Sequence, residues 1–324
     1  MVIFFFEHSE RIFTQYERCQ QMLNIQQKKF LNANFSRVAY HVPLNAYSSF
    51  RIGGPSDGII FPQNTQELSV LLPWLTNEDI PWMVMGGGSN ILFDDSGFCG
   101  IIINLMHYSK MHLQANLIEA DAGISLKRIC LHAIRNHLGG MNFALGIPGT
   151  LGGAVRMNAG ACGGQMSDVI QSIVCMTSDG IPHHIDKKDL STGYRNISWN
   201  HIANDSIVIS ASIKLFPDDK VLIRQDARQK LMYRKRRQPI GCASAGSFFK
   251  NPSNRLSAGF LIEQAGMKGY QMGDAVVSKK HANFIVNKGQ ATSKDVISLM
   301  QLIQEKVMIK FNVHLQPEVK IIHV

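Results

Sequence analysis

The glycine-rich stretch from residue 146 to residue 164 constrains the fold of this chain more than any other feature. Seven of its nineteen residues are glycine, which is more than turns alone would require. A second cluster, Gly86-Gly87-Gly88-Ser89-Asn90, directly follows the strand-like run 81–85. Glycine lets backbone N–H groups approach a ligand closely because no side chain intervenes. The fold therefore has to support two loops whose surface is mainly backbone.

The composition is that of an ordered globular protein. The chain has 324 residues, 45% of them hydrophobic, so we expect a sizeable core and roughly two domains. Its 27 glycines and 11 prolines are too few for a collagen-like or low-complexity chain. No apolar run approaches the ~20 residues that span a bilayer, and the opening run 2–6 is too short for a secretory signal. We therefore expect a cytoplasmic protein with no membrane partner.

Charge and cysteine content bear on partners and on redox state. The 33 Lys and Arg residues outnumber the 24 Asp and Glu residues, and the net charge of +9 favours anionic ligands. The densest basic run, 234–237, is either a solvated helix face or a phosphate-recognition element. The six cysteines contain no C-x-x-C pair, so we expect reduced thiols rather than a disulfide framework or a zinc site.

Hydrophobic periodicity predicts short strands mixed with helices. Asn64 and Glu67 have the spacing of a helix N-cap and its acidic partner, and Thr292 and Asp295 repeat that pattern near the end of the chain. Further helices are expected at 124–138 and 221–237, and the expected strands are 58–61, 81–85, 100–104, 117–121 and 318–322. Because strands and helices do not alternate regularly, the pattern favours an α+β fold over a doubly wound parallel sheet.

The two glycine loops match neither common nucleotide-binding fingerprint. There is no G-x-G-x-x-G at a strand–helix junction and no G-x-x-x-x-G-K-[ST] in the chain. The remaining possibility is a cofactor with a diphosphate that is bound by the backbone of two separate loops. Flavin adenine dinucleotide (FAD) fits that requirement. Ser89 and Asn90 would add side-chain donors to the first loop. The alternative is that both stretches are tight loops that need positive φ angles.

A third stretch, Ser244–Pro252, could carry chemistry of a different kind. Ser247 lies between small residues and is followed by Lys250 and Asn251, so it is either a nucleophile or proton donor beside an anion site, or part of a polar turn. It lacks the spacing of a G-x-S-x-G nucleophile elbow. The adjacent His183 and His184 would face opposite ways on a strand, and we expect no metal site.

Taken together, these stretches resemble the UDP-N-acetylenolpyruvoylglucosamine reductase (UDP-N-acetylmuramate dehydrogenase) family over about residues 40–324. No single sequence block is specific for the family, but the order and spacing of all the blocks are. The blocks are Ser49-Phe50-Arg51-Ile52-Gly53-Gly54-Pro55-Ser56-Asp57, Gly87-Gly88-Ser89-Asn90, Gly146-Ile147-Pro148-Gly149-Thr150, Met157-Asn158-Ala159-Gly160-Ala161, Gly246-Ser247-Phe248-Phe249-Lys250-Asn251-Pro252, Val277-Ser278-Lys279-Lys280-His281-Ala282-Asn283-Phe284 and Gln316-Pro317-Glu318-Val319.

The resemblance implies an α+β fold of the FAD-binding type that vanillyl-alcohol oxidase relatives share (the PCMH-like fold). Two subdomains would surround the flavin, and a C-terminal α+β domain would bind substrate. The domains implied are a probably helical N-terminal extension at 1–38, a FAD-binding domain at 39–218 with subdomains at about 39–104 and 105–218, and a substrate-binding domain at 219–324. The extension, in which Ile12, Tyr16, Cys19 and Leu23 recur at helical spacing, falls outside the resemblance and has no assigned role.

The implied reaction reduces the enolpyruvyl ether of UDP-N-acetylglucosamine enolpyruvate to UDP-N-acetylmuramate, a bacterial peptidoglycan precursor. NADPH would reduce FAD, and hydride from flavin N5 would then add to the methylene carbon of the substrate. Charge accumulates on the carboxylate as an enolate, so the site needs a cation or donors there and one positioned proton donor. The implied partners are small molecules only, with no nucleic acid and no obligate protein partner.

The resemblance assigns residues to these tasks. Ser247 matches the proton donor, Arg195 the arginine at the substrate carboxylate, and Glu318 the acidic partner. Substrate contacts are expected from Tyr194, Lys250 and Asn251. Cofactor contacts are expected from Arg51, Gly86, Gly87, Gly88, Ser89, Asn90, Ile147, Pro148, Gly149, Thr150, Gly152, Gly153, Asn158 and Gly160.

This chain departs from the family pattern near Arg195. Ile197 stands where the family often has a serine, and Ser198 follows, which leaves the register around Arg195 open by one residue. The short interval between Arg195 and Ser247 resembles the branch that lacks an extra substrate-covering loop. Two other functions remain alternatives: a flavin oxidase of the same broad fold with another substrate, and a nucleic-acid binder that uses the basic segment 224–237.

Overall fold

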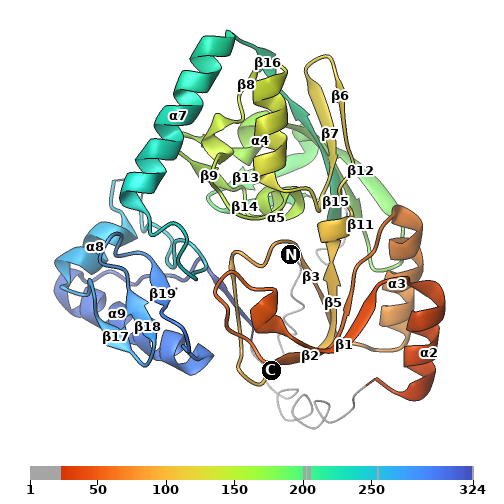
Figure 1. The fold of residues 1–324 in the computed structure, drawn as a ribbon, viewed down its shortest axis with the longest axis horizontal. Helices are drawn as coiled ribbons and strands as arrows, with labels where there is room; N and C mark the ends of the chain where they lie inside the picture. Colours follow the sequence, from red (N-terminus) through yellow and green to blue (C-terminus); the bar gives the residue numbers. More distant parts are fainter. Residues whose placement is uncertain (1–22, 200–201, 203–205, 254, 323–324) are drawn as a thin grey trace. The chain divides into compact units, whose positions relative to one another are not determined.

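The computed structural model describes residues 23–199, 202, 206–253 and 255–322. Most of the N-terminal segment expected to be helical, including Ile12, Tyr16 and Cys19, therefore lies outside the described residues. The chain forms two compact units (Figure 1). The first unit comprises residues up to His41, Asp57–Gly87 and Cys99–Met232, and the second comprises Val42–Ser56, Gly88–Phe98 and residues from Tyr233 onward.

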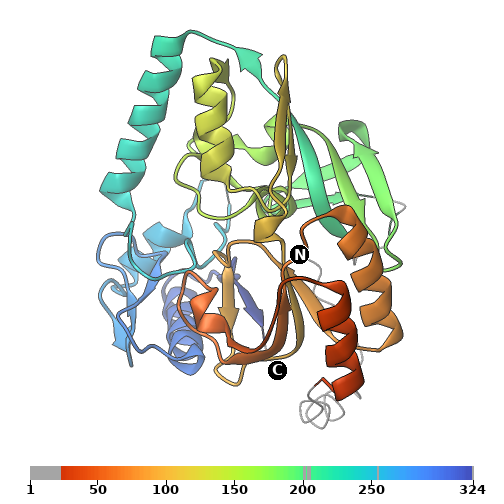
Figure 2. The ribbon, with the colours of Figure 1, turned by 45° about the vertical axis from the view of Figure 1, so that its right-hand side comes forward.

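The first unit contains a four-stranded sheet that two helices cover. The strand order is β1-β2-β5-β3, with β1 at Val38–Pro43, β2 at Pro55–Ile60, β3 at Trp82–Met85 and β5 at Phe98–Asn104. Helices α2 (Ile25–Asn34) and α3 (Thr65–Asn77) lie side by side along it (Figures 1 and 2), and the Phe30 and Trp74 rings stack with centroids 4.5 Å apart. Asn64 caps α3 as predicted, accepting the Glu67 N–H at 2.9 Å.

A five-stranded antiparallel sheet forms the rest of the first unit. Its order is β12-β11-β15-β7-β6, with β6 at Met111–Gln114, β7 at Leu117–Asp121, β11 at Ile170–Met176, β12 at Pro182–Asp186 and β15 at Ile207–Lys214. Its core includes residues of helix α4 (Leu126–Arg135), helix α5 (Leu151–Arg156) and helix α7 (Lys220–Arg237). The shorter elements here are β8 (Leu138–Gly139), β9 (Gly160–Ala161), β10 (Gly164–Gln165), α6 (Met166–Val169), β13 (Leu190–Gly193), β14 (Asn196–Trp199) and β16 (Phe216–Pro217).

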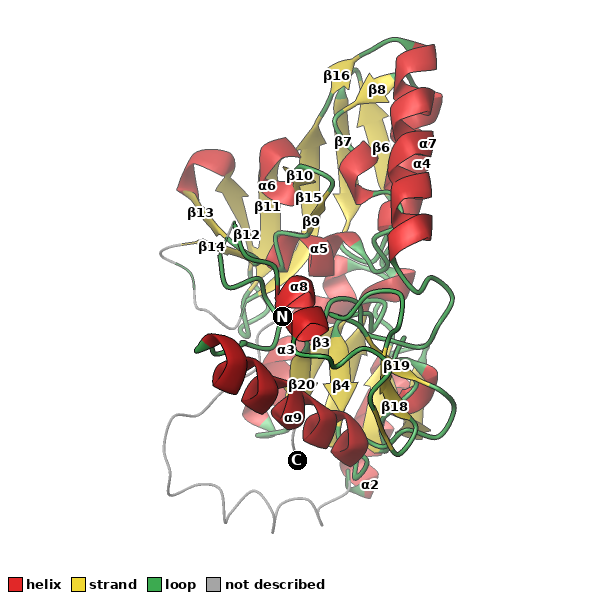
Figure 3. Ribbon diagram, turned by 90° about the vertical axis from the view of Figure 1, so that its left-hand side faces the viewer, coloured by secondary structure: helices red, strands yellow, loops and turns green. Residues whose placement is uncertain are grey.

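The second unit has its own apolar core. It consists of the sheet β17-β18-β19, the parallel pair β4–β20, and two helices. The strands are β4 (Ile91–Phe93), β17 (Gln271–Met272), β18 (Ala275–Val277), β19 (Ile285–Asn287) and β20 (Lys320–Ile322), and the helices are α8 (Ala258–Gln264) and α9 (Ser293–Phe311). Helix α9 contacts β17 and β18 (Figures 1 and 3). Thr292 and Asp295 form the capping box that the sequence predicted for α9.

The predicted elements and the α+β mixture are present. Cys130, Cys162, Cys175 and Cys242 are free thiols, in agreement with the expectation of reduced cysteines at these positions, whereas Cys19 lies outside the described residues. Among the described residues, no helix is long and apolar enough to cross a bilayer.

Candidate active site

The first unit brings the two predicted glycine loops into contact. Gly86 and Gly87 follow the end of β3, and Thr150 immediately precedes α5. A Cβ atom added to Gly86 would overlap the Thr150 hydroxyl, and one added to Gly87 would lie 3.2 Å from the Gly149 Cα. Glycine is required at both positions, because Gly86 lies too close to the Thr150 side chain and Gly87 too close to the Gly149 backbone to leave room for a Cβ. The first glycine loop therefore presents only backbone at this contact.

Main-chain hydrogen bonds fix the second glycine loop to the segment before α4. The Leu126 N–H donates to the Gly149 carbonyl at 3.2 Å, and the Gly152 N–H donates to the Ala122 carbonyl at 2.8 Å. Gly149 has φ = 115°, a conformation that L side chains rarely adopt. Thr150 makes no side-chain capping bond to α5. Main-chain hydrogen bonds therefore hold this loop at two points, and its conformation at Gly149 depends on glycine.

The third glycine of the first loop belongs to the second unit. Gly88 has φ = 58°, its carbonyl accepts the Ser49 N–H at 3.0 Å, and an added Cβ would overlap the Tyr47 carbonyl oxygen. Asn90, two residues later, donates from Nδ2 to the Glu318 carbonyl at 3.1 Å. A predicted cofactor residue is thus hydrogen-bonded to the backbone of a predicted catalytic residue that is far away in sequence but lies in the same unit.

Arg51 borders a cavity of about 590 Å³ in the second unit. The Arg51 side chain is exposed and its backbone has φ = 57°. The cavity is lined by Asn45, Ala46, Ser48, Arg51, Ile52, Gly53, Gly54, Asp95, Gly289, Gln290, Ala291 and Thr292. Asp95 is already engaged, because its carboxylate accepts the Ser293 N–H and hydroxyl. Arg51 therefore supplies the positive charge on this cavity wall.

The second unit also places Ser247 and Glu318 on neighbouring segments. The Glu318 N–H donates to the Phe248 carbonyl at 2.8 Å, and the Lys250 N–H donates to the Gln316 carbonyl at 2.9 Å. Phe249 and Pro317 form an isolated antiparallel bridge between the same segments. Ser247 and Glu318 are both partly buried. The two segments that carry these predicted catalytic residues, far apart in sequence, therefore lie side by side.

Arg195 lies in the first unit, at the turn of the β13–β14 hairpin. Gly193 pairs with Asn196, so Tyr194 and Arg195 are the two turn residues, and the Arg195 guanidinium lies 5.0 Å from the centre of the Tyr194 ring. Ile197 is completely buried in the core of that unit. The hydrophobic side chain at 197 therefore serves packing, which explains the departure from the family pattern there.

Two predicted binding residues have structural contacts of their own. Asn158 donates from Nδ2 to the Gly193 carbonyl at 3.0 Å and accepts the Ser167 N–H at 3.0 Å, so its amide braces the hairpin that carries Arg195. Asn251 accepts the Ala258 N–H at the start of α8 at 3.1 Å. Their expected roles toward cofactor and substrate remain predictions.

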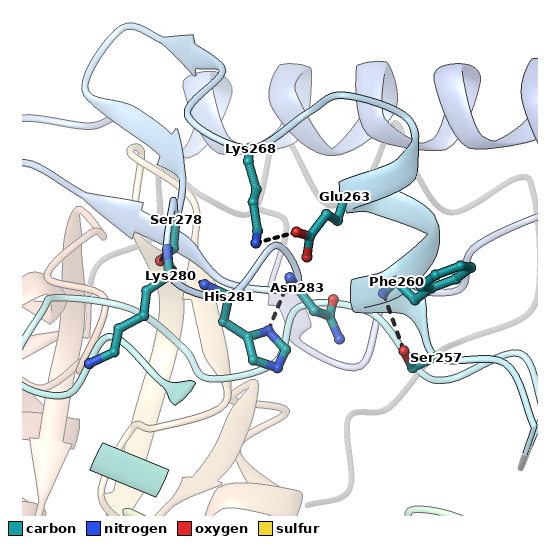
Figure 4. Close-up of polar contacts among 8 residues, drawn as sticks. All are labelled: Ser257, Phe260, Glu263, Lys268, Ser278, Lys280, His281 and Asn283. Carbon is teal, nitrogen blue, oxygen red and sulfur yellow. Dashed lines mark hydrogen bonds and ion pairs between the residues drawn. The ribbon is translucent and has the colours of Figure 1, made fainter. Parts of the chain in front are cut away.

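The sequence reasoning missed Asn283, which is buried beside the Ser247 segment. Its Oδ1 accepts the Phe249 N–H at 2.9 Å and its Nδ2 donates to the Phe249 carbonyl at 2.8 Å. Nearby, burial and the positive charge of Lys268 lower the pKa of His281, whose Nδ1 accepts the Asn283 N–H at 3.3 Å (Figure 4). The signal was present, because both residues belong to a block that carried the family resemblance.

Comparisons with known proteins agree with this geometry. Residues 56–186 match the model of the FAD binding domain, and residues 238–322 match that of the UDP-N-acetylenolpyruvoylglucosamine reductase C-terminal domain. The UDP-N-acetylenolpyruvoylglucosamine reductases of Desulfosudis oleivorans and Clostridium kluyveri are each 38% identical. The first alignment covers 88% of this chain and 95% of that protein, and the second covers 86% and 91%.

A solved structure supports the same assignment. The crystal structure of UDP-N-acetylenolpyruvylglucosamine reductase from Thermus caldophilus has a TM-score of 0.76 and 34% identity to this protein. The match covers 88% of this chain and 98% of that one. The expected α+β architecture with an FAD-binding domain is confirmed. The chain therefore belongs to the UDP-N-acetylenolpyruvoylglucosamine reductase family.

Proposed function

We propose that this protein reduces UDP-N-acetylglucosamine enolpyruvate to UDP-N-acetylmuramate, with FAD as cofactor and NADPH as hydride donor. The observation that carries the proposal is the 38% identity to a reductase of this name over nearly its whole length. The reaction would supply a peptidoglycan precursor in the bacterial cytoplasm. Its partners would be small molecules only.

The glycine loops of the first unit fit the diphosphate of FAD. The Thr150 side chain at Gly86 and the Gly149 backbone at Gly87 occupy the space that a Cβ would need, so a ligand at this loop would meet amide groups rather than side chains of the loop. Gly153 differs, because an added Cβ would meet only the Thr150 hydroxyl at 3.9 Å. That open space supports a cofactor above the start of α5. When bound, FAD supplies hydride transfer from NADPH to the enolpyruvyl methylene carbon.

The protein's own residues would stabilise the developing negative charge and deliver the proton. In the proposed mechanism the Arg195 guanidinium stabilises the substrate carboxylate while negative charge develops on it. The Ser247 hydroxyl donates a proton to the carbon that bears the ether oxygen, which completes the lactyl group. Glu318 is the acidic partner in this site. The main-chain bonds between the Ser247 and Glu318 segments support this arrangement, because they hold both residues in one geometry.

Helix α7 supports capture of phosphorylated ligands. Ile223 and Ala227 are buried against the first unit, whereas Arg224, Arg228 and Arg236 are exposed. Exposed positive charge raises the local concentration of anions such as UDP-sugars and NADPH, and salt screens that effect. We propose this role for the basic run in place of nucleic-acid binding.

The proposal is tested by the visible absorption spectrum of the purified protein, recorded without oxygen. Flavin bands should bleach on addition of NADPH and return on addition of UDP-N-acetylglucosamine enolpyruvate. Bleaching without return would favour the alternative, a flavin oxidase with another substrate, and oxygen would then restore the bands. Absence of flavin bands after reconstitution with FAD would contradict the reading of both glycine loops.

A further inference from the structure

Asn283 holds the segment that carries Ser247 through three hydrogen bonds. It lies between β18 and β19 and is 4% exposed. The Phe248 N–H donates to the Asn283 carbonyl at 2.8 Å. The Asn283 side chain then engages both polar groups of the Phe249 backbone, accepting its N–H at 2.9 Å and donating to its carbonyl at 2.8 Å.

The opposite side of the same segment carries Glu318. The Phe248 carbonyl accepts the Glu318 N–H, so the backbone after Ser247 lies between Asn283 on one side and Glu318 on the other. The rings of Phe248 and Phe249 are 1% exposed and belong to the core of the second unit. The direction of the Ser247 side chain is therefore set by a backbone that Asn283 and the core fix together.

Asn283 is itself oriented by the preceding turn. Its N–H donates to His281 Nδ1 at 3.3 Å, and the His281 N–H donates to Ser278 Oγ at 3.3 Å. Figure 4 shows His281 and Asn283 side by side, with Ser278 at the start of the turn. Among amino acids of this size only asparagine offers an acceptor and a donor from one planar group. An aspartate would keep the bond from the Phe249 N–H and lose the bond to its carbonyl.

We propose that Asn283 is a positioning residue for the reduction. It aligns Ser247 with the substrate carbon while the Glu318 segment keeps its pairing with the Ser247 segment. This inference rests on the proposed function and adds a residue that does not touch substrate. A displacement of about 1 Å at a reacting group can cost about 100-fold in rate. Loss of one Asn283 bond should therefore affect proton delivery much more than flavin reduction by NADPH, which needs no proton from Ser247.

The test compares Asn283→Asp with a matched control, Asn287→Asp, in the full-length enzyme with FAD bound. Asn287 is 6% exposed, accepts the Gly289 and Ala291 N–H groups and donates to the Phe50 carbonyl at 3.1 Å. The same substitution therefore removes the same kind of bond in the same unit. Its side chain makes no hydrogen bond to the Ser247 segment among the described residues.

Stopped-flow absorbance would follow the two half-reactions separately. Asn283→Asp should slow flavin reoxidation by UDP-N-acetylglucosamine enolpyruvate by about 10- to 100-fold, while reduction by NADPH stays within about threefold of wild type. The solvent deuterium isotope effect on reoxidation should rise because proton transfer becomes slower. Asn287→Asp should change neither the ratio of the two rates nor the isotope effect.

Equal slowing of both half-reactions by Asn283→Asp, or equal behaviour of the two variants, would overturn the inference. If Asn283→Asp does not fold, Asn283→Ser serves instead, because its shorter side chain lacks the amide group that bonds to Phe249 and should give the same selective effect. A wild-type enzyme that is not reoxidised by the enolpyruvyl substrate would overturn the proposed function. A wild-type enzyme that is reoxidised, with no selective effect of either Asn283 variant, would overturn this inference alone.

Discussion

The two units present chemically different surfaces. In the first unit, the glycines of one loop meet the Thr150 side chain and the Gly149 backbone of the other loop, and sterics exclude any further side chain there. In the second unit, backbone pairing places side by side the two segments that carry Ser247 and Glu318, whose side chains are the proposed functional groups. The comparison teaches that a cofactor surface can be built by leaving side chains out, whereas proton transfer requires one side chain in one place.

The substitution with the largest expected effect tests the proposed role of a side chain in the second unit. Ser247→Ala should slow flavin reoxidation by the enolpyruvyl substrate by about 10²- to 10⁴-fold, the usual contribution of a general acid. Reduction by NADPH should remain nearly intact, as anaerobic stopped-flow absorbance would show. Ser244→Ala, a similar change nearby, is the control and should leave both rates near wild type. If Ser247→Ala slowed both half-reactions equally, Ser247 would not be the proton donor.

The next substitution tests the glycine loops of the first unit, which present backbone rather than side chains. Gly86→Ala places a methyl group against the Thr150 hydroxyl, and overpacking of this kind costs about 1–3 kcal/mol. FAD affinity should therefore fall by about 10- to 100-fold, measured by fluorescence titration of the flavin-free protein. Gly180→Ala is the matched control, because its Cβ would lie 2.5 Å from the Ser69 carbonyl oxygen in a distant turn of the same unit. Equal loss of FAD affinity in both variants would contradict the assignment of this loop.

A substitution with a smaller expected effect tests whether the second unit can be destabilised without a change in catalysis. Thr292→Ala removes the capping bond to the Asp295 N–H and should lower the free energy of unfolding by about 1 kcal/mol. Thermal unfolding should shift by about 2–4 °C, with the ratio of the half-reaction rates unchanged. Lys294→Ala, an exposed change in the same helical turn, should not destabilise the protein. A selective loss of reoxidation in Thr292→Ala would link α9 to catalysis.

The smallest expected effect is on the pH dependence of the stability of the second unit. Burial and Lys268 hold the pKa of His281 below its usual value of about 6.5, so the unfolded chain binds this proton more readily than the folded one. The stability contribution of neutral His281 is complete above about pH 6.5 and decreases as the pH falls toward its folded pKa. Unfolding midpoints should therefore fall on acidification, and less so in His281→Gln. The exposed His314 provides the control, because His314→Gln should leave the wild-type pH dependence.

Much of the local structure could be predicted because its determinants are close in sequence. The caps at Asn64 and Thr292 involve a partner three residues away, and both form as predicted. The glycine content of 146–164 indicated a backbone-lined loop, and Gly149 has the positive φ that such a loop needs. Arg195 and Glu318 were found only through resemblance to a family, because nothing in their spacing connects them.

The sequence by itself determined the α+β class, the helix ends and the two glycine loops, since these follow from periodicity, capping and the absence of Cβ atoms. Only the tertiary structure decided that Gly86 meets Thr150, that the Ser247 segment lies beside the Glu318 segment, and that Asn283 braces the backbone directly after Ser247. Those contacts depend on long-range pairing of segments, which a linear pattern does not encode.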